Sequence, residues 1–120
     1  AEKVFDAFSA QLTQYPSGFC QMMMTLDFAL GPSQEIVIAV DEGDSRTGEI
    51  LREIFGRFLP DKVVLLHPAK GEPARKIEML SPFIKPQLPL NGRPTVYVCK
   101  NYVCALPVTE VEKLKDLLQK

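Results

Sequence analysis

A strand–helix–strand pattern between Glu35 and His67 constrains the fold of this chain more than any other feature. The run EIVIAV, from Glu35 to Val40, is apolar and rich in β-branched residues, which is typical of a strand buried on both faces. An amphipathic helix is expected from about Arg46 to Phe58, and KVVLLH, from Lys62 to His67, is expected to be a second buried strand. Such a βαβ unit has parallel strands and a right-handed crossover.

The expected helix has one apolar face and one charged face. Pro60 and Asp61 are expected to end it. The apolar side chains expected to face the core are Ile50, Leu51, Ile54, Phe55, Phe58 and Leu59, and the charged ones expected to face water are Glu49, Arg52, Glu53 and Arg57.

The second half of the chain adds a short helix and a hairpin. The stretch from Pro68 to Pro94 is rich in proline, with a short helix expected around Ala74 to Leu80 and a loop over Lys85 to Pro94. Thr95 to Cys99 and Val103 to Leu106 are expected to pair as a β-hairpin, which Pro107 closes.

A final helix is expected to begin at Thr109, with Glu112 three residues on as a capping box. The element order after the leading segment is then β-α-β-(α)-β-β-α, which is the order of the thioredoxin-like α/β core. Pro94 precedes the third strand, where that fold has a cis proline. A small doubly wound α/β arrangement in three layers is the alternative. The buried face of the final helix is expected to comprise Val111, Leu114, Leu117 and Leu118.

Two helices are expected before the first strand. One covers Ala1 to Thr13 and is interrupted by Tyr15 and Pro16, because proline disfavours helix in the residue before it. The second covers Gly18 to Leu30, with Ser17 as its expected N-cap and Gly31 and Pro32 as its stop. We divide the chain accordingly into a helical segment, 1–31, and an α/β domain, 32–120.

The second helix is apolar nearly all round, which indicates burial on both sides. Its expected packing residues are Phe19, Met22, Met23 and Leu26, with Cys20, Met24 and Phe28 on another side. The favoured interpretation is that the helix packs against a partner outside this chain. A methionine-rich binding groove is the alternative.

Composition excludes several classes of function. The apolar content of 46% and charged content of 24% match a globular protein with a core of its own, and the net charge of −1 offers nothing to steer the chain to nucleic acid or an anionic membrane. No apolar run is long enough to span a bilayer, and no signal peptide is visible. Three cysteines are an odd count for a disulfide scaffold, so a reducing cytoplasm is expected.

The two cysteines of YVCKNYVCALP, Cys99 and Cys104, are the candidate redox residues. A hairpin that turns at Asn101 and Tyr102 makes Cys99 directly oppose Cys104, at a separation that allows a strained, easily reduced disulfide. A hairpin offers no helix dipole to activate a thiolate, so two structural thiols are the favoured interpretation. Cys20 is expected in the core.

Metal and ligand sites are weakly indicated. Zinc needs four ligands, and one hairpin with a single histidine, His67, does not supply them, so His67 is interpreted as structural and neither metal nor cofactor is expected. The loop after the first strand carries Asp41, Glu42 and Asp44, which could attract a cation or small ligand, with Ser45 beside them. Helix capping by Asp44 or Ser45 is the favoured interpretation. A thioredoxin would carry CxxC here, and this loop has no cysteine.

Two long stretches together resemble a known family. EIVIAVDEGDSRTGEILREIFGRFLPDKVVLL and GRPTVYVCKNYVCALPVTEVEKL are similar to the C-terminal end of the thioredoxin-domain proteins that include spermatogenesis-associated protein 20 and its bacterial relatives. The resemblance covers about Tyr15 to the C-terminus and is diffuse from Pro68 to Leu90. Members have a thioredoxin-like domain, then a six-hairpin helical barrel like that of glycosidases, then a C-terminal α/β segment.

The resemblance implies that this chain is a C-terminal fragment whose first helices end the barrel. The expected function is a non-catalytic accessory domain that packs against the rest of the parent polypeptide, and a dimer of the isolated chain would support this role. A redox module at Cys99 and Cys104 and a ligand or cation site at Asp41 and Asp44 are the alternatives. An enzyme activity of this fragment is not expected.

Overall fold

A four-stranded mixed sheet organises the chain from Gln34 onward in the computed structural model, which describes residues 2–101 and 103–119. The strand order is β2-β1-β3-β4, with β1 and β2 parallel and the pairs β1–β3 and β3–β4 antiparallel. This arrangement confirms the thioredoxin-like α/β core, and the antiparallel strands exclude the doubly wound alternative. The strands are β1 Gln34–Val40, β2 Lys62–Pro68, β3 Thr95–Lys100 and β4 Val103–Cys104.

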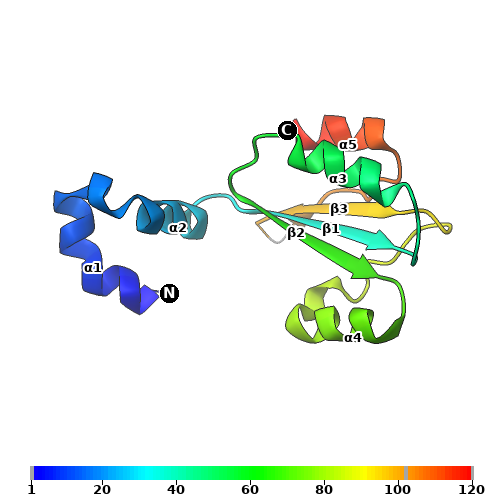
Figure 1. Ribbon diagram of the computed structural model, residues 1–120, viewed down its shortest axis with the longest axis horizontal. Coiled ribbons are helices and arrows are strands. Elements are labelled where there is room, and N and C mark those ends of the chain that lie inside the picture. Colours follow the sequence, from blue (N-terminus) through cyan, green and yellow to red (C-terminus); the bar gives the residue numbers. More distant parts are fainter. Residues whose placement is uncertain (1, 102, 120) are drawn as a thin grey trace. The chain divides into compact units, whose positions relative to one another are not determined.

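Helices cover both faces of this sheet (Figure 1). Helix α3, Thr47–Phe55, and helix α5, Val111–Leu118, lie on one face, and α4, Gly71–Leu80, lies on the other, followed by the short 3₁₀ turn η2, Pro82–Ile84. The βαβ unit, the short helix and the terminal helix expected from the sequence are therefore all present.

The main core lies between β1, β3 and the helices α3 and α5. Alternate residues of a strand point to opposite faces, so Ile36 and Ile38 of β1 pack with Ile54 of α3 and Leu114 of α5, all fully buried. Val37 and Ala39 lie on the other face of β1 and are also fully buried. The expectation that the first strand is buried on both faces is confirmed.

Two expectations about the βαβ unit are wrong. The helix expected to reach Phe58 ends at Phe55 with Gly56 as its C-cap, and Phe55 and Phe58 are 62% and 91% exposed rather than inward-facing. Strand β2 is not buried on both faces, because it is the outer strand of the sheet, and its Leu66 is 46% exposed.

The sequence also drew attention to the start of the last helix and to the proline before the third strand. Helix α5 begins at Val111 after the N-cap Glu110, without a side-chain cap, and Glu112 pairs instead with Lys115 through a 2.7 Å bond, so the capping box is wrong. The described residues contain no cis peptide bond, so Pro94 is trans.

Residues 1–33 form a separate compact unit of helices. Helix α1, Glu2–Gln14, is followed by the 3₁₀ turn η1, Pro16–Phe19, and α2, Cys20–Leu30. The break at Pro16 and the stop at Gly31 are confirmed, but Ser17 does not cap α2, whose N-cap is Phe19 without a side-chain bond. Ala1, the expected first helical residue, lies outside the described residues.

Candidate functional site

Helix α2 exposes apolar side chains around most of its circumference. None of its residues is buried, and Phe19, Met22 and Leu26 are half-buried. Within this unit Phe8 and Phe19 approach with ring centroids 6.2 Å apart, and Leu12 of α1 is the buried residue. Cys20 is exposed, with its thiol donating to the Ser17 carbonyl at 3.0 Å, so its expected place in a core is wrong. The largest exposed apolar side chains of α2 are Met23, Met24, Phe28 and Leu30, at 36%, 66%, 36% and 79%.

The hairpin brings Cys99 and Cys104 directly opposite each other, in the register expected from the sequence. The Ala105 N–H donates to the Val98 carbonyl at 2.9 Å, so the cysteines occupy a non-hydrogen-bonded position of the ladder, where side chains approach closest. Their sulfur atoms are joined, 2.03 Å apart, and the interpretation as two separate structural thiols is therefore wrong. Asn101 has a positive φ of 49°, as a tight turn requires, and Tyr102 lies outside the described residues.

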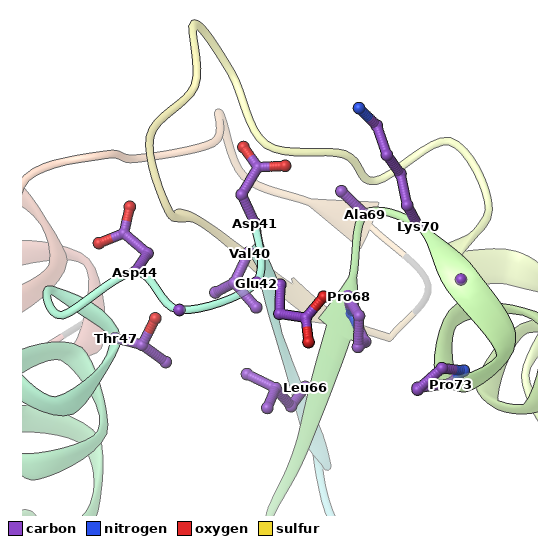
Figure 2. A pocket seen from close by; sticks show the side chains of 12 residues that line it. Val40, Asp41, Glu42, Asp44, Thr47, Leu66, Pro68, Ala69, Lys70 and Pro73 are labelled. Atoms are coloured by element: carbon purple, nitrogen blue, oxygen red, sulfur yellow. The ribbon is translucent and has the colours of Figure 1, made fainter.

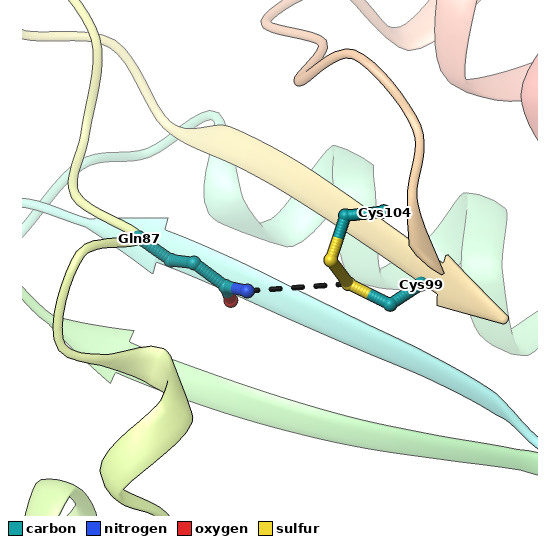
Figure 3. The surroundings of a disulfide bond; sticks show 3 residues. All are labelled: Gln87, Cys99 and Cys104. Atoms are coloured by element: carbon teal, nitrogen blue, oxygen red, sulfur yellow. Dashed lines mark hydrogen bonds between the residues drawn. A yellow bond between two sulfur atoms is a disulfide. The ribbon is translucent and has the colours of Figure 1, made fainter. Parts of the chain in front are cut away.

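The two sulfur-bearing residues differ in their surroundings. Cys99 is 1% exposed and lies on the α4 face of the sheet, whereas Cys104 is exposed at the edge. The side-chain amide of Gln87 points at the bond, with its Nε2 4.0 Å from Cys99 Sγ (Figure 3). Gln87 is 7% exposed, and its Oε1 has no hydrogen-bond partner among the described residues. A buried amide oxygen is therefore left unsatisfied next to the disulfide.

A buried histidine holds Gln87 in place. The Nδ1 of His67 lies 2.7 Å from the Gln87 carbonyl oxygen, and its Nε2 lies 3.1 Å from Glu78 Oε1. Since a carbonyl only accepts, Nδ1 carries a proton and donates it. His67 is fully buried at the end of β2 and both its nitrogens have partners, as a structural histidine requires. Glu78, on α4, was not singled out in the sequence, because no local spacing links it to His67.

A hollow of about 630 Å³ lies where β1 and β2 end and α3 and α4 begin (Figure 2). Asp41, Glu42 and Asp44 line it from the first loop and Lys70 from the second, and in Figure 2 Asp41 and Lys70 extend toward its open side. The apolar part of its wall is made by Val40, Leu66, Pro68, Ala69 and Pro73.

Asp44 is already engaged by a neighbouring cation. Its Oδ1 accepts from the Arg46 main-chain N–H at 2.9 Å and from Nε at 3.0 Å, while Oδ2 accepts from Nη2, which also reaches the Gly92 carbonyl at 3.2 Å. These side-chain hydrogen bonds hold the pKa of Asp44 below its ordinary value and raise that of Arg46. Helix α3 has no side-chain cap, and Ser45 is exposed. Asp44 thus organises the turn before α3 instead of capping the helix.

Residues 2–101 and 103–119 were also compared with the requirements of a metal site and of a membrane-spanning helix. Within these ranges no group of three or more histidine, cysteine, aspartate or glutamate side chains is arranged to hold a metal ion. No helix in the described part of the chain is long and apolar enough to cross a membrane.

The fold and the hairpin define a thioredoxin-like α/β domain in which a disulfide joins the last two strands, without CxxC after the first strand. Over 112 residues, 93% of its length, the chain is 30% identical to spermatogenesis-associated protein 20 of Mus musculus and 29% identical to that of Homo sapiens. It is homologous to a region of that protein and spans 14% of the length of these relatives. No family model matches the chain, and no solved structure gives a significant match.

Proposed function

We propose that this chain is a non-catalytic accessory domain that packs against the rest of a longer polypeptide. The observation that carries the proposal is the exposed apolar surface of α2, from Met23 to Leu30. An apolar helix is stable in water when a partner covers it, and a contiguous apolar patch on a soluble domain marks an interaction surface. Homology to a region covering 14% of each relative's length agrees with such a role.

The proposed partner surface is helical. Residues 1–31 would continue a helical barrel in the parent polypeptide, as the family resemblance implies, and Phe19, Met22, Met23 and Leu26 would pack on it. A glutamate placed at Met24 tests this, because Met24 is 66% exposed here and would be covered in the parent. The control is Gln21→Glu, which places the same charge on a polar, exposed position of the same helix.

The test compares each substitution in two contexts. In the 120-residue chain, Met24→Glu is expected to change the free energy of unfolding by less than about 0.5 kcal/mol, as exposed positions do. In the longer polypeptide the same substitution is expected to increase protease sensitivity around residue 33 and to lower the melting temperature, whereas Gln21→Glu leaves both unchanged. A longer polypeptide that tolerates Met24→Glu as well as Gln21→Glu would disprove the packing role.

A second candidate function is reversible thiol–disulfide exchange at Cys99 and Cys104, and the observation that favours it is the exposure of Cys104 at the edge of the sheet. A disulfide that external thiols can reach is the kind that is labile or regulatory. The protein is equilibrated with mixtures of reduced and oxidised glutathione, and the free thiols are then counted. The count shows whether Cys99 and Cys104 are bonded or free at each ratio. Sulfur atoms that stay free under mild oxidation, or a bond that survives strong reduction, would exclude this function.

The cation site at Asp41 and Asp44 has less support. Both oxygens of Asp44 accept hydrogen bonds from Arg46, which leaves Asp41 and Glu42 as the free carboxylates of that loop. Adding Mg²⁺ or Ca²⁺ and following the amide resonances of residues 41–45 tests the site, and unchanged resonances at millimolar cation would exclude it.

A further inference from the structure

The disulfide Cys99–Cys104 is chemically asymmetric. Cys104 is exposed on a two-residue edge strand, whereas Cys99 is 1% exposed on β3. Thiol–disulfide exchange requires the attacking sulfur to approach along the S–S bond from the side of the attacked atom. The exposure of Cys104 and the burial of Cys99 therefore favour attack at Cys104.

One buried polar side chain contacts the sulfur of Cys99. The buried Gln87 amide faces Cys99 Sγ, and its Oε1 has no hydrogen-bond partner among the described residues (Figure 3). An oxidised disulfide sulfur has no proton to donate, so it cannot satisfy an amide oxygen. In the bonded form Nε2 donates to the Cys99 sulfur at 4.0 Å. A half-turn about the last torsion of Gln87 exchanges Oε1 and Nε2, so the S–H of a reduced Cys99 would have Oε1 as its acceptor in place of that long N–H···S contact.

Gln87 is also held in place by its main chain. Its N–H donates to the Ile84 carbonyl at 2.8 Å, and its carbonyl accepts from the buried His67 Nδ1 at 2.7 Å. The side-chain amide consequently remains beside Cys99 in either redox state.

We propose that a small thiol of the glutathione class opens the Cys99–Cys104 bond by attacking Cys104, and that Gln87 acts as a positioning residue by accepting a hydrogen bond from the Cys99 thiol released. The inference rests on the exchange function proposed above. The attacking thiolate forms a new S–S bond to Cys104 Sγ, and the electron pair of the broken bond leaves on Cys99 Sγ, which takes a proton from solvent. A second thiol then attacks the mixed disulfide, releasing the oxidised small-molecule disulfide and the Cys104 thiolate.

The direction of attack is testable by mapping the mixed disulfide. The experiment uses a Cys20→Ser background, in which the hydroxyl replaces the exposed third thiol and keeps a donor for the Ser17 carbonyl. The bridged protein is treated briefly with reduced glutathione, quenched with acid and digested with trypsin, which separates the two cysteines by cutting after Lys100. Glutathione is expected on the Cys104 peptide at least tenfold more often than on the Cys99 peptide.

Three outcomes are informative. An excess on Cys99, or an equal distribution, overturns the direction of attack while leaving exchange itself intact. A bond that glutathione neither reduces nor modifies over the full concentration series overturns the exchange function together with this inference. An excess on Cys104 supports both.

The role of Gln87 is tested by Gln87→Met, which removes the amide and keeps the main-chain bond to His67. This variant loses the acceptor of the reduced state and only a 4.0 Å N–H···S contact of the bonded form, so the equilibrium with glutathione is expected to shift toward the disulfide by about two- to tenfold. The matched control is Gln34→Met, because Gln34 is a second buried glutamine with an unpartnered amide atom, and its register opposite Lys100 places it on the other face of the sheet from Cys99. Equal shifts in the two variants, or none in Gln87→Met, would overturn the assignment.

Discussion

The Nδ1–H of His67 donates to the main-chain carbonyl of Gln87 across 2.7 Å, between residues that are 20 positions apart. This bond joins the end of β2 to the loop before β3, on the α4 face of the sheet. Other contacts hold the same loop: the Tyr97 hydroxyl donates to the Leu88 carbonyl at 2.7 Å, and the Leu90 N–H donates to the Thr95 hydroxyl at 2.8 Å. The buried imidazole therefore helps to fix the segment that faces the disulfide.

Glu78 supplies the second partner of that imidazole, and its removal has a predictable cost. Glu78→Ala leaves His67 Nε2 buried without a partner, so the free energy of unfolding is expected to fall by about 1–3 kcal/mol. Glu78→Gln keeps a side-chain oxygen and adds an amide N–H, so Nε2 retains a partner, and this variant is expected to lose less than half of that. Urea unfolding of both variants measures the difference, and equal losses would contradict this account of His67.

Ile54 of α3 and Phe58, which lies beyond the end of that helix, should respond very differently to truncation. Ile54→Ala empties a fully buried position between the sheet and α5, which is expected to cost about 2–5 kcal/mol. Phe58→Ala removes a side chain that is 91% exposed, so its effect is expected to stay within about 0.5 kcal/mol. Thermal or urea unfolding checks both values, and a large loss at Phe58 would mean that the side chain is covered in solution.

The Asp44–Arg46 pair should make stability depend on pH on the acid side. The pKa of Asp44 is lowered from its ordinary value of 3.8, first by the side-chain hydrogen bonds from Arg46. A lowered folded-state pKa contributes stability that is present above the unfolded pKa and is lost as the pH falls through the folded value. Arg46→Ala should therefore destabilise the protein at neutral pH and lose its effect in strong acid. An NMR titration of Asp44 should show its pKa rising in the variant, and an unchanged value would refute the pairing.

Residues 34–120 are expected to fold without residues 1–33. The structure divides there into two compact units, and the sheet, α3, α4 and α5 all belong to the second. A chain that starts at Gln34 should show one cooperative urea transition whose midpoint matches that of the 120-residue chain. Amide resonances of β1 and β3 that disperse only in the longer chain would contradict the prediction.

The sequence predicted the α/β core well because its signals are local and periodic. The apolar runs at Glu35–Val40 and Lys62–His67 and the helix between them defined the βαβ unit. The hairpin register followed from assuming a turn at Asn101 and Tyr102, and the structure has that register. The predicted end of the helix was wrong because the apolar spacing continues to Phe58, whereas α3 ends at Phe55 with Gly56 as its C-cap. Burial of β2 was overestimated because an apolar run does not reveal which strand lies at the edge of a sheet.

The candidate site depended on contacts that spacing does not encode. Glu78 and Gln87 are separated from His67 by 11 and 20 residues, and only the packing of α4 and the following loop brings them to it. Whether Cys99 and Cys104 are free or bonded depends on chemistry outside the chain as well as on register. Capping by Asp44 was a sound local expectation, but Arg46, two residues on, uses both carboxylate oxygens.

The position of β2 has a consequence for how the sheet can be enlarged. At one edge of the sheet β4 is only two residues long and is joined to β3 by the Cys99–Cys104 disulfide. At the other edge, within residues 2–101 and 103–119, the seven residues of β2 pair with β1 alone. The outward main-chain groups of β2, with few charges to discourage a neighbour, form a template for another extended segment. A strand from a second chain would therefore pair beside Val64 and Leu66 of β2, and the opposite edge, formed by β4 and the disulfide, would not change.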